Sequence, residues 1–140
     1  HFDNHTYVDH IAPNCNSSEN YKGIIDDKAT AVFNGKVMVQ PDAQKINAFQ
    51  SNQNILLSDD ATINSKPELE IYADDVLCSH GSTTGQLDEE AVFYLRTRGV
   101  SEISAKKMMI RAFVFEVLEE IKLESFRTHI EDLIDEKFKV

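Results

Sequence analysis

A cysteine and a histidine two residues apart, Cys78 and His80, are the side chains whose types and spacing best suit chemistry. They follow a run of strand-forming residues, and in an extended chain residues i and i+2 project from the same face. A thiolate beside an imidazole supplies half of a site for a soft metal such as zinc or iron. The alternative is a buried free cysteine next to a surface histidine. If the pair is a metal site, its other ligands must come from distant residues or another chain.

A looser run of possible ligands opens the chain: His1, His5, His10 and Cys15. Its spacing fits neither an H-x3-H pair on a helix nor a C-x2-C loop. We therefore interpret these histidines as lying on the surface or at the edge of the fold.

Adjacent carboxylates occur at several places, among them Asp26-Asp27, Asp59-Asp60, Asp74-Asp75 and Glu89-Glu90. In polysaccharide-cleaving enzymes such groups bind calcium or act as acid and base. Neighbours along a strand point to opposite faces, however, so solvated turns are the simpler explanation. The sequence has no G-x4-G-K-[ST] phosphate loop and no G-x-S-x-G motif, so we expect no ATP hydrolysis by this chain itself.

The composition restricts the class of protein. The 140 residues are 41% hydrophobic and 27% charged, which suits a soluble domain with a modest core. A net charge of −10 repels nucleic acid, and no apolar run approaches the roughly 18 residues of a membrane span. Two cysteines are too few for a disulfide framework and fit a reducing, cytoplasmic setting. Because the first residue is His1 rather than methionine, we expect a piece of a longer chain.

The elements that must position these residues differ between the two parts of the chain. In the first, short bursts of apolar and β-branched residues alternate with Asn, Asp, Ser, Gly and Pro, which predicts strands. A weak recurrence every 23 residues, at Ile25, Ala48 and Ile71, is typical of a β-solenoid, with residues 50–54 as an amide ladder at a coil corner. The dipeptide Asn34-Gly35 instead indicates a hairpin in an antiparallel sandwich. The pattern leaves both architectures open.

The remainder of the chain has helical periodicity. Asp88 is placed to cap a first helix that Gly99 ends in a left-handed conformation. A second helix starts near Ser101 or Ser104 and runs to about Ile121. It is apolar on two faces, so we expect it to be buried on both or offered to a partner on one. A third helix is amphipathic in the ordinary way, with the stripe Phe126, Ile130, Leu133, Ile134 and Phe138.

Long stretches of the chain resemble the SufB/SufD family of scaffold proteins for iron–sulfur cluster assembly. Around residues 66–99 the matching text is KPELEIYADDV, then CSHG, then TGQLDEEAVFYLRTRGV. Upstream, DNHTYVDH, YKGI and AVFNGKVMVQPDAQ also look like that family. SufB chains typically carry an H-E segment where this chain has CSHG at positions 78–81, so the resemblance favours the SufD branch and its C-terminal part.

The resemblance implies a fold that is mainly β with C-terminal α. The expected architecture is the last coils of a right-handed parallel β-helix over residues 1–85, followed by a small region of about three helices over residues 86–140. The resemblance also implies that Asn34-Gly35 lies at a coil corner rather than in a hairpin.

The resemblance further implies a non-enzymatic scaffold that pairs with a SufB-like chain and docks a SufC-like ABC ATPase on its helices. His80, with Cys78 beside it, would belong to a nascent-cluster site shared with SufB. The chain alone would bind no cofactor, and a transient iron–sulfur cluster would form in the assembled complex. The residues expected at the ATPase docking surface are Tyr94, Arg98, Met109 and Phe113.

Two other functions stay open on the sequence. One is a carbohydrate-active β-helix enzyme, which requires carboxylates that converge in a groove. The other is a structural interaction module in which Cys78 and His80 are inert. Because the edge of a truncated solenoid recruits other chains, we also expect a homodimer in isolation, formed through the last coils.

Overall fold

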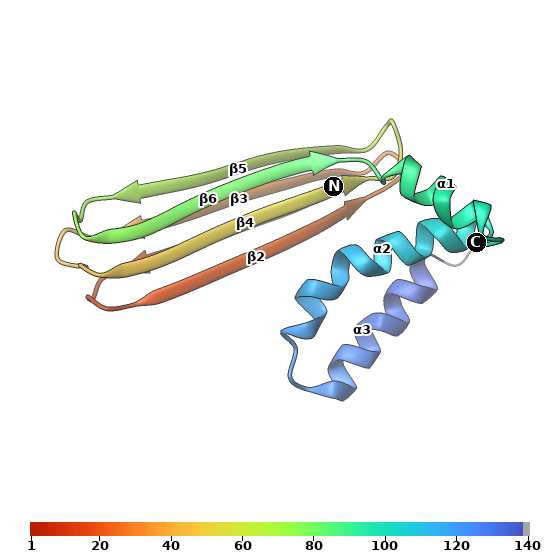
Figure 1. The fold of residues 1–140 in the computed structure, drawn as a ribbon. Helices are drawn as coiled ribbons and strands as arrows, with labels where there is room; N and C mark the ends of the chain where they lie inside the picture. Colours follow the sequence, from red (N-terminus) through yellow and green to blue (C-terminus); the bar gives the residue numbers. More distant parts are fainter. Residues whose placement is uncertain (139–140) are drawn as a thin grey trace. The chain divides into compact units, whose positions relative to one another are not determined.

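The computed structural model describes residues 1–138 as six strands followed by three helices (Figure 1). The strands are β1 (Phe2–His10), β2 (Asn16–Ile25), β3 (Thr30–Val39), β4 (Ile46–Leu56), β5 (Thr62–Ile71) and β6 (Val76–Gly85). The helices are α1 (Glu89–Thr97), α2 (Glu102–Glu119) and α3 (Glu124–Lys137). The chain divides into two compact units, with all six strands in residues 1–85 and the helices in the second.

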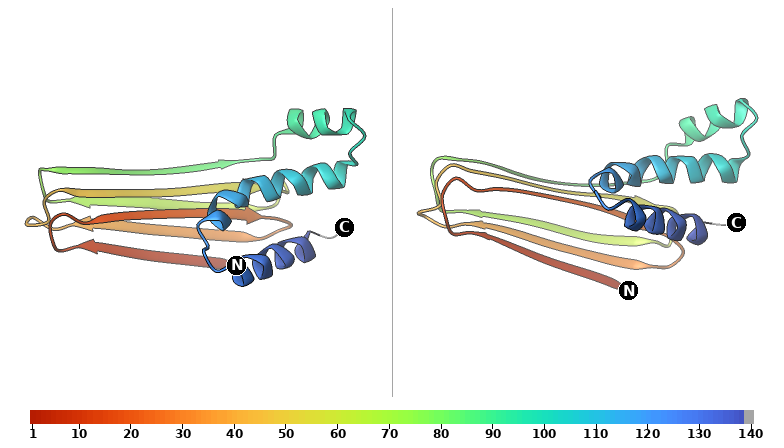
Figure 2. Two further views of the ribbon diagram at one scale, coloured as in Figure 1. Left: turned by 60° about the horizontal axis from the view of Figure 1, so that its bottom comes forward. Right: turned by 90° about the horizontal axis from the view of Figure 1, so that it is seen from below.

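Successive strands alternate between two sheets that face each other (Figure 2). One sheet has the order β1-β3-β5 and the other β2-β4-β6, and every pairing is parallel. Parallel neighbours separated by a crossing to the opposite sheet are the geometry of a stacked coil and not of a hairpin. The expected fold, mainly β with β-helix-like coils and a helical C-terminal part, is therefore confirmed.

The length of a coil differs from the recurrence in the sequence. Residues paired in neighbouring strands lie 29 to 32 positions apart, so the 23-residue spacing is wrong. Ile25 pairs with Leu56 rather than with Ala48, and Ile71 is exposed. Each coil contains two strands of about ten residues and two turns, which is why the true repeat is longer.

Asn34-Gly35 is neither a hairpin nor a coil corner. It lies inside β3, where Asn34 pairs with His5 and with Lys66 on the two flanking strands. A Cβ atom built on Gly35 would lie 2.6 Å from Gln50 Nε2 and 2.6 Å from the ring of Phe33. The glycine is therefore explained by close packing against the facing sheet rather than by a turn.

The interior of the strand unit is apolar at one end and polar in the middle. The apolar cluster contains Val37, Val39, Ala43, Ile46, Ala48 and Ala73. Next along β4 come Gln50, Asn52 and Asn54, all buried. Residues 50–54 thus lie within a strand, with alternate amides facing inward, and the expectation of a corner ladder is wrong.

The turns stack on one another as the strands do. Asn14 N–H donates to Gln44 O at 2.9 Å, and Asp75 N–H donates to Gln44 Oε1 at 2.8 Å. Asn14, Asp27 and Lys45 have positive φ angles of 60°, 55° and 58°, which reverse the chain within short connections. These bonds align each coil with the next.

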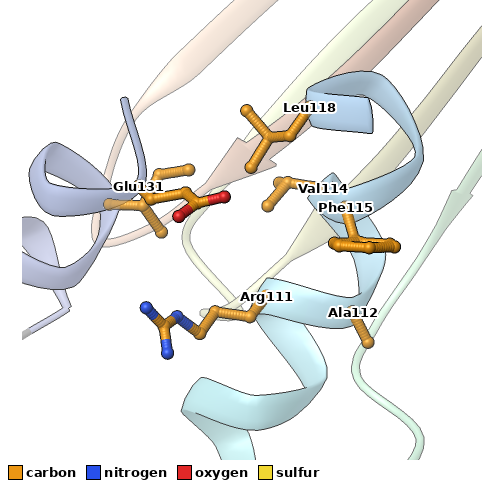
Figure 3. A pocket seen from close by; sticks show the side chains of 7 residues that line it. Arg111, Ala112, Val114, Phe115, Leu118 and Glu131 are labelled. Carbon is orange, nitrogen blue, oxygen red and sulfur yellow. The ribbon is translucent and has the colours of Figure 1, made fainter. Parts of the chain in front are cut away.

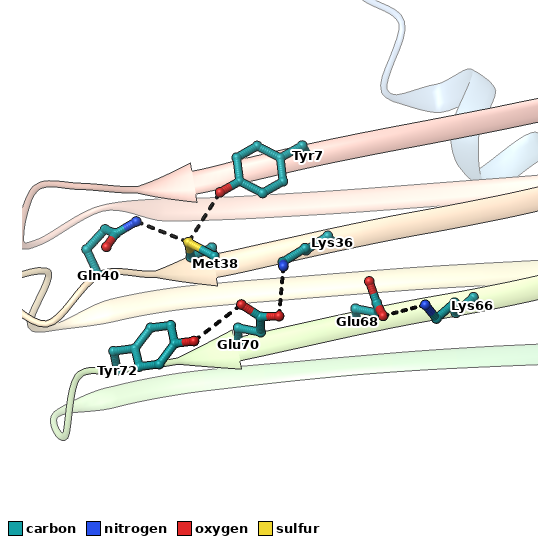
Figure 4. Close-up of polar contacts among 8 residues, drawn as sticks. All are labelled: Tyr7, Lys36, Met38, Gln40, Lys66, Glu68, Glu70 and Tyr72. Atoms are coloured by element: carbon teal, nitrogen blue, oxygen red, sulfur yellow. Dashed lines mark hydrogen bonds and ion pairs between the residues drawn. The ribbon is translucent and has the colours of Figure 1, made fainter.

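The outer face of the β1-β3-β5 sheet is joined across strands by polar contacts (Figure 4). Lys36 on β3 donates to Glu70 on β5 at 2.7 Å, and this bond is the main cause of a raised Lys36 pKa. Tyr7 and Gln40 both donate to the Sδ atom of Met38, at 3.2 and 3.1 Å. Because these groups are partly exposed, we assign them to strand registry rather than to a binding site.

Helices α1 and α2 begin at the predicted capping residues, whereas α2 ends at Glu119 rather than near Ile121 and α3 has no side-chain cap. The side chain of Asp88 accepts from the backbone N–H groups of Glu90 and Ala91, and that of Ser101 accepts from Ser104 N–H. Gly99 has a φ of +87°, as expected for a left-handed C-terminal position. None of the described helices combines the length and apolarity that a membrane crossing requires.

Candidate functional site

Cys78 and His80 lie on β6, the strand that ends the β2-β4-β6 sheet within the described residues. The register pairs Cys78 with Ala48 and His80 with Gln50, both of which are buried on β4. Partners in a parallel pair share a face of the sheet. Both side chains therefore belong to the row that faces the opposite sheet.

The two side chains differ in exposure. Cys78 is half-buried and packs against the apolar cluster, whereas His80 is exposed. A Cβ atom built on Gly81 would meet no atom within 4 Å. Gly81 itself belongs to the outward row, and in the inward row both His80 and Ser82 are exposed, because no strand covers β6 among residues 1–138.

Burial raises the pKa of the Cys78 thiol, and a backbone hydrogen bond with Ala48 opposes this shift in part. Desolvation disfavours the thiolate, so the group is protonated at neutral pH. A metal that binds here must displace that proton.

Within residues 1–138 no group of three or more His, Cys, Asp or Glu side chains is placed to hold a metal ion. Cys78 and His80 together offer two ligands, whereas a tetrahedral metal site needs four. The pair as placed is therefore an incomplete site.

The histidines near the start of the chain lie apart from this row. His5 is exposed and pairs with Asp3 at 2.9 Å. His10 is buried, with its Nε2 atom 2.9 Å from Ser17 Oγ, so it lies on the edge strand β1 but not at the surface. It is buried because the register aligns it with the inward-facing Val39.

The adjacent carboxylates fall at the ends of elements. Asp26-Asp27, Asp59-Asp60 and Asp74-Asp75 lie in connections between strands, and Glu89-Glu90 opens α1. Lys28 approaches Asp60 at 4.0 Å across two such connections. These carboxylates thus lie in turns and at a helix start rather than on a strand face, as the sequence indicated.

The residues expected at a docking surface occupy two helices. On α1, Tyr94 is exposed, and the guanidinium of Arg98 lies 3.7 Å from the centre of its ring. On α2, Met109 and Phe113 are half-buried one turn apart.

A pocket of about 340 Å³ lies between α2 and α3 (Figure 3). Arg111 lines the pocket, and its Nη2 atom lies 2.8 Å from Asp135 Oδ2 on α3. Phe115 on α2 lines this pocket and is itself exposed. The lining residues are Arg111, Ala112, Val114, Phe115, Leu118, Glu131 and Ile134.

The buried amides of β4 are the feature that sequence reasoning misplaced. Asn52 Oδ1 accepts from Asn54 Nδ2 at 2.7 Å and from Ser65 Oγ at 2.8 Å. Ser82 on β6 bonds Ser65 at 2.7 Å, which joins this network to the strand of His80. The alternation of amides at 50, 52 and 54 was the available signal, since one face of a strand carries every second residue.

Comparison with known proteins identifies the family. Residues 1–113 match the family model described as "SUF system FeS cluster assembly, SufBD core domain". The chain is 42% identical to the iron–sulfur cluster assembly protein SufD of Escherichia coli over 128 residues, 91% of this chain and 30% of that protein. It is 43% identical over 132 residues to a SufBD family protein of Synechocystis, 94% of this chain and 29% of that protein. SufD of Bacillus subtilis is 31% identical over 126 residues, 88% of this chain and 29% of that protein.

The chain thus spans about a third of the length of the curated relatives it matches. The match covers all six parallel strands and extends into α2. Two of these relatives are named SufD, in agreement with the CSHG text at positions 78–81. This chain belongs to the SufBD core family of the SUF iron–sulfur cluster assembly system.

Proposed function

We propose that this chain is a non-enzymatic scaffold subunit for iron–sulfur cluster assembly. The observation that carries the proposal is the placement of Cys78 and His80 in one row of an edge strand without further ligands nearby. A thiol and an imidazole are suitable ligands for iron, and a second chain at this edge would complete the site. The names of the SufD relatives support the same role.

The partner at the strand unit is proposed to be a SufB-like scaffold. An edge strand has unpaired backbone N–H and C=O groups that a neighbouring chain can bond. The exposed His80 lies on this edge strand, so that chain would meet it there. The transient cluster would form between the two scaffolds as cargo, with His80 as a ligand and Cys78 as its neighbour.

The partner at the helices is proposed to be a SufC-like ABC ATPase. The sequence contains no phosphate loop, so these residues would not hydrolyse nucleotide themselves. Tyr94, Arg98, Met109 and Phe113 would meet it, with the stacked Tyr94 and Arg98 at its centre, since these residue types dominate interface energetics. The two free cysteines fit a reducing cytoplasm as the place of assembly.

The test is cluster formation by the reconstituted scaffold–ATPase complex. We expect His80→Ala to abolish cluster output while the complex still assembles. His5→Ala is the matched control, because His5 is also exposed on a strand of the same unit but belongs to a different sheet. Wild-type output from His80→Ala would contradict the proposal.

The inert module is the remaining alternative function. It predicts that anaerobic titration of the complex with ferrous iron produces no thiolate-to-metal absorbance that depends on Cys78 or His80. A signal that disappears in Cys78→Ser or His80→Ala would exclude it.

A further inference from the structure

We propose that Gln50 positions the His80 imidazole by accepting a hydrogen bond from one ring N–H, which leaves the other ring nitrogen available as a ligand. The proposal deepens the function proposed for His80 and takes its biological meaning from it. It rests on a row of three side chains that crosses one sheet.

The row consists of Glu19 on β2, Gln50 on β4 and His80 on β6. The register pairs Glu19 with Gln50 and Gln50 with His80. Since neighbouring strands in a sheet lie about 4.8 Å apart, each of these side chains is adjacent to the next. Gln50 is the middle member, with the carboxylate on one side and the imidazole on the other.

The carboxylate determines which way the Gln50 amide points. Gln50 Nε2 donates to Glu19 Oε2 at 2.9 Å. An ionised carboxylate only accepts hydrogen bonds, so the amide must turn its NH2 group toward β2. The carbonyl oxygen Oε1 then faces away from Glu19, toward the side on which His80 lies.

That oxygen has no hydrogen-bond partner among the described residues, although it is buried and Gln50 is only 3% exposed. A buried carbonyl without a donor is rare, and it needs an explanation. Thr6 Oγ1 is also buried without a partner, and no bond joins it to Gln50. His80 is exposed and pairs with Gln50 on the neighbouring strand, so a ring N–H is the donor placed to reach Oε1.

The close approach of the facing strand keeps the amide in place. Gly35 leaves room for Gln50 Nε2, which a Cβ at that position would contact at 2.6 Å. An amide held by Glu19 on one side and by Gly35 across the interior presents its oxygen in one direction.

The consequence for His80 is a single neutral tautomer. A ring that donates one N–H to a carbonyl must have its lone pair on the other nitrogen. Metal-binding histidines are oriented in this manner, and removing the outer partner typically lowers metal affinity or activity about 10- to 100-fold. Gln50 would thus act through His80 and would not itself touch iron.

The decisive measurement is the ¹⁵N chemical shift of the His80 ring nitrogens in the purified chain without metal, at a pH where the ring is neutral. In the wild-type chain we expect two well-separated shifts, one from the protonated and one from the bare nitrogen. Gln50→Met removes the acceptor at similar side-chain length, so the two shifts should move toward each other as the tautomers interconvert. Gln53→Met is the matched control, since Gln53 lies on the same strand in the outward row.

Glu19→Ala provides a second variant that leaves both Gln50 and His80 intact. Freed from the carboxylate, the amide can turn, and the His80 shifts should again converge. Unchanged His80 shifts in both Gln50→Met and Glu19→Ala would overturn the proposal.

The same variants separate this proposal from the proposed function. In the reconstituted complex, Gln50→Met should lower cluster output about tenfold, in line with a lost outer partner. If the ring shifts converge but output is unaffected by either Gln50→Met or His80→Ala, the positioning is correct and the proposed function is wrong. If output falls in His80→Ala while the shifts do not respond to Gln50→Met, the function stands and the positioning proposal is wrong.

Discussion

Replacing Asn52 with alanine should destabilise the strand unit far more than replacing an outward asparagine of the same strand. Asn52 is 3% exposed, and its Oδ1 atom accepts from Asn54 Nδ2 at 2.7 Å and from Ser65 Oγ at 2.8 Å. Ser82 Oγ is a more distant donor at 3.4 Å. Alanine removes the acceptor and leaves the buried Asn54 amide and the half-buried Ser65 hydroxyl without this partner.

The magnitude follows from the bonds that disappear. Two short hydrogen bonds at about 1 kcal/mol each give a loss of roughly 2 kcal/mol. The buried Asn54 amide retains a bond to Thr83 O at 3.3 Å, so its partial loss of partners adds about 1 kcal/mol. The expected total is about 3 kcal/mol in the free energy of unfolding. Asn47→Ala, which loses one exposed bond to Asn16, should lose about 0.5 kcal/mol.

Urea unfolding followed by tyrosine fluorescence measures this difference in the strand unit alone. In a Tyr94→Phe background the remaining tyrosines are Tyr7, Tyr21 and Tyr72, all within residues 1–85. With a slope of about 2 kcal/mol per molar urea, Asn52→Ala should lower the midpoint by about 1.5 M. An Asn52→Ala midpoint equal to that of Asn47→Ala would refute the reasoning that the buried amides stabilise the coil stack.

Three further predictions concern the edge strand β6. Gly81→Ala should leave the melting temperature nearly unchanged, because the added Cβ meets no atom within 4 Å. The same variant should weaken co-purification with a SufB-like chain. Equal binding by the variant and the wild type would exclude an interface at Gly81. Burial raises the Cys78 pKa, so its alkylation rate should reach half-maximum at a higher pH than an exposed cysteine peptide. An alkylation midpoint at or below that of the peptide would contradict the raised pKa. Because the pKa of the thiol is higher in the folded chain than in the unfolded chain, its contribution to stability is fully present below the unfolded pKa and is lost as pH rises through the folded pKa. Light scattering should find a homodimer of the isolated chain, joined through the last coils, whereas a monomer at high concentration would exclude that pairing.

The helical part was largely predictable because its signals are local. Asp88, Ser101 and Gly99 mark helix ends through bonds or dihedral angles that involve only residues a few positions away. The amphipathic stripes of α2 and α3 likewise depend on the sequence alone. The α2–α3 pocket was not predicted, since its lining combines Phe115 with Glu131 and Ile134 from another helix.

The strand part was predictable in kind but not in detail. Short β-branched bursts indicated strands, and the family resemblance correctly favoured stacked coils over a sandwich. The coil length was wrong, and so were the corner positions given to Asn34-Gly35 and to residues 50–54. Both segments were predicted to be turns because glycine and asparagine are common in turns. In the structure they lie within strands, where Gly35 allows the two sheets to pack closely and the Asn52 and Asn54 amides form a hydrogen bond in the interior.

The amino-acid sequence by itself determined where α1 and α2 begin, the extended nature of the first 85 residues and the juxtaposition of Cys78 with His80 on one strand face. Each of these depends on residues that are close along the chain. The tertiary structure decided the register, and with it which side chains meet across coils: His80 beside Gln50, Asn52 beside Ser65, and His10 in the interior. The reason is physical, because strand partners lie about 30 positions apart, and shifting a strand by one residue would turn every inward side chain outward.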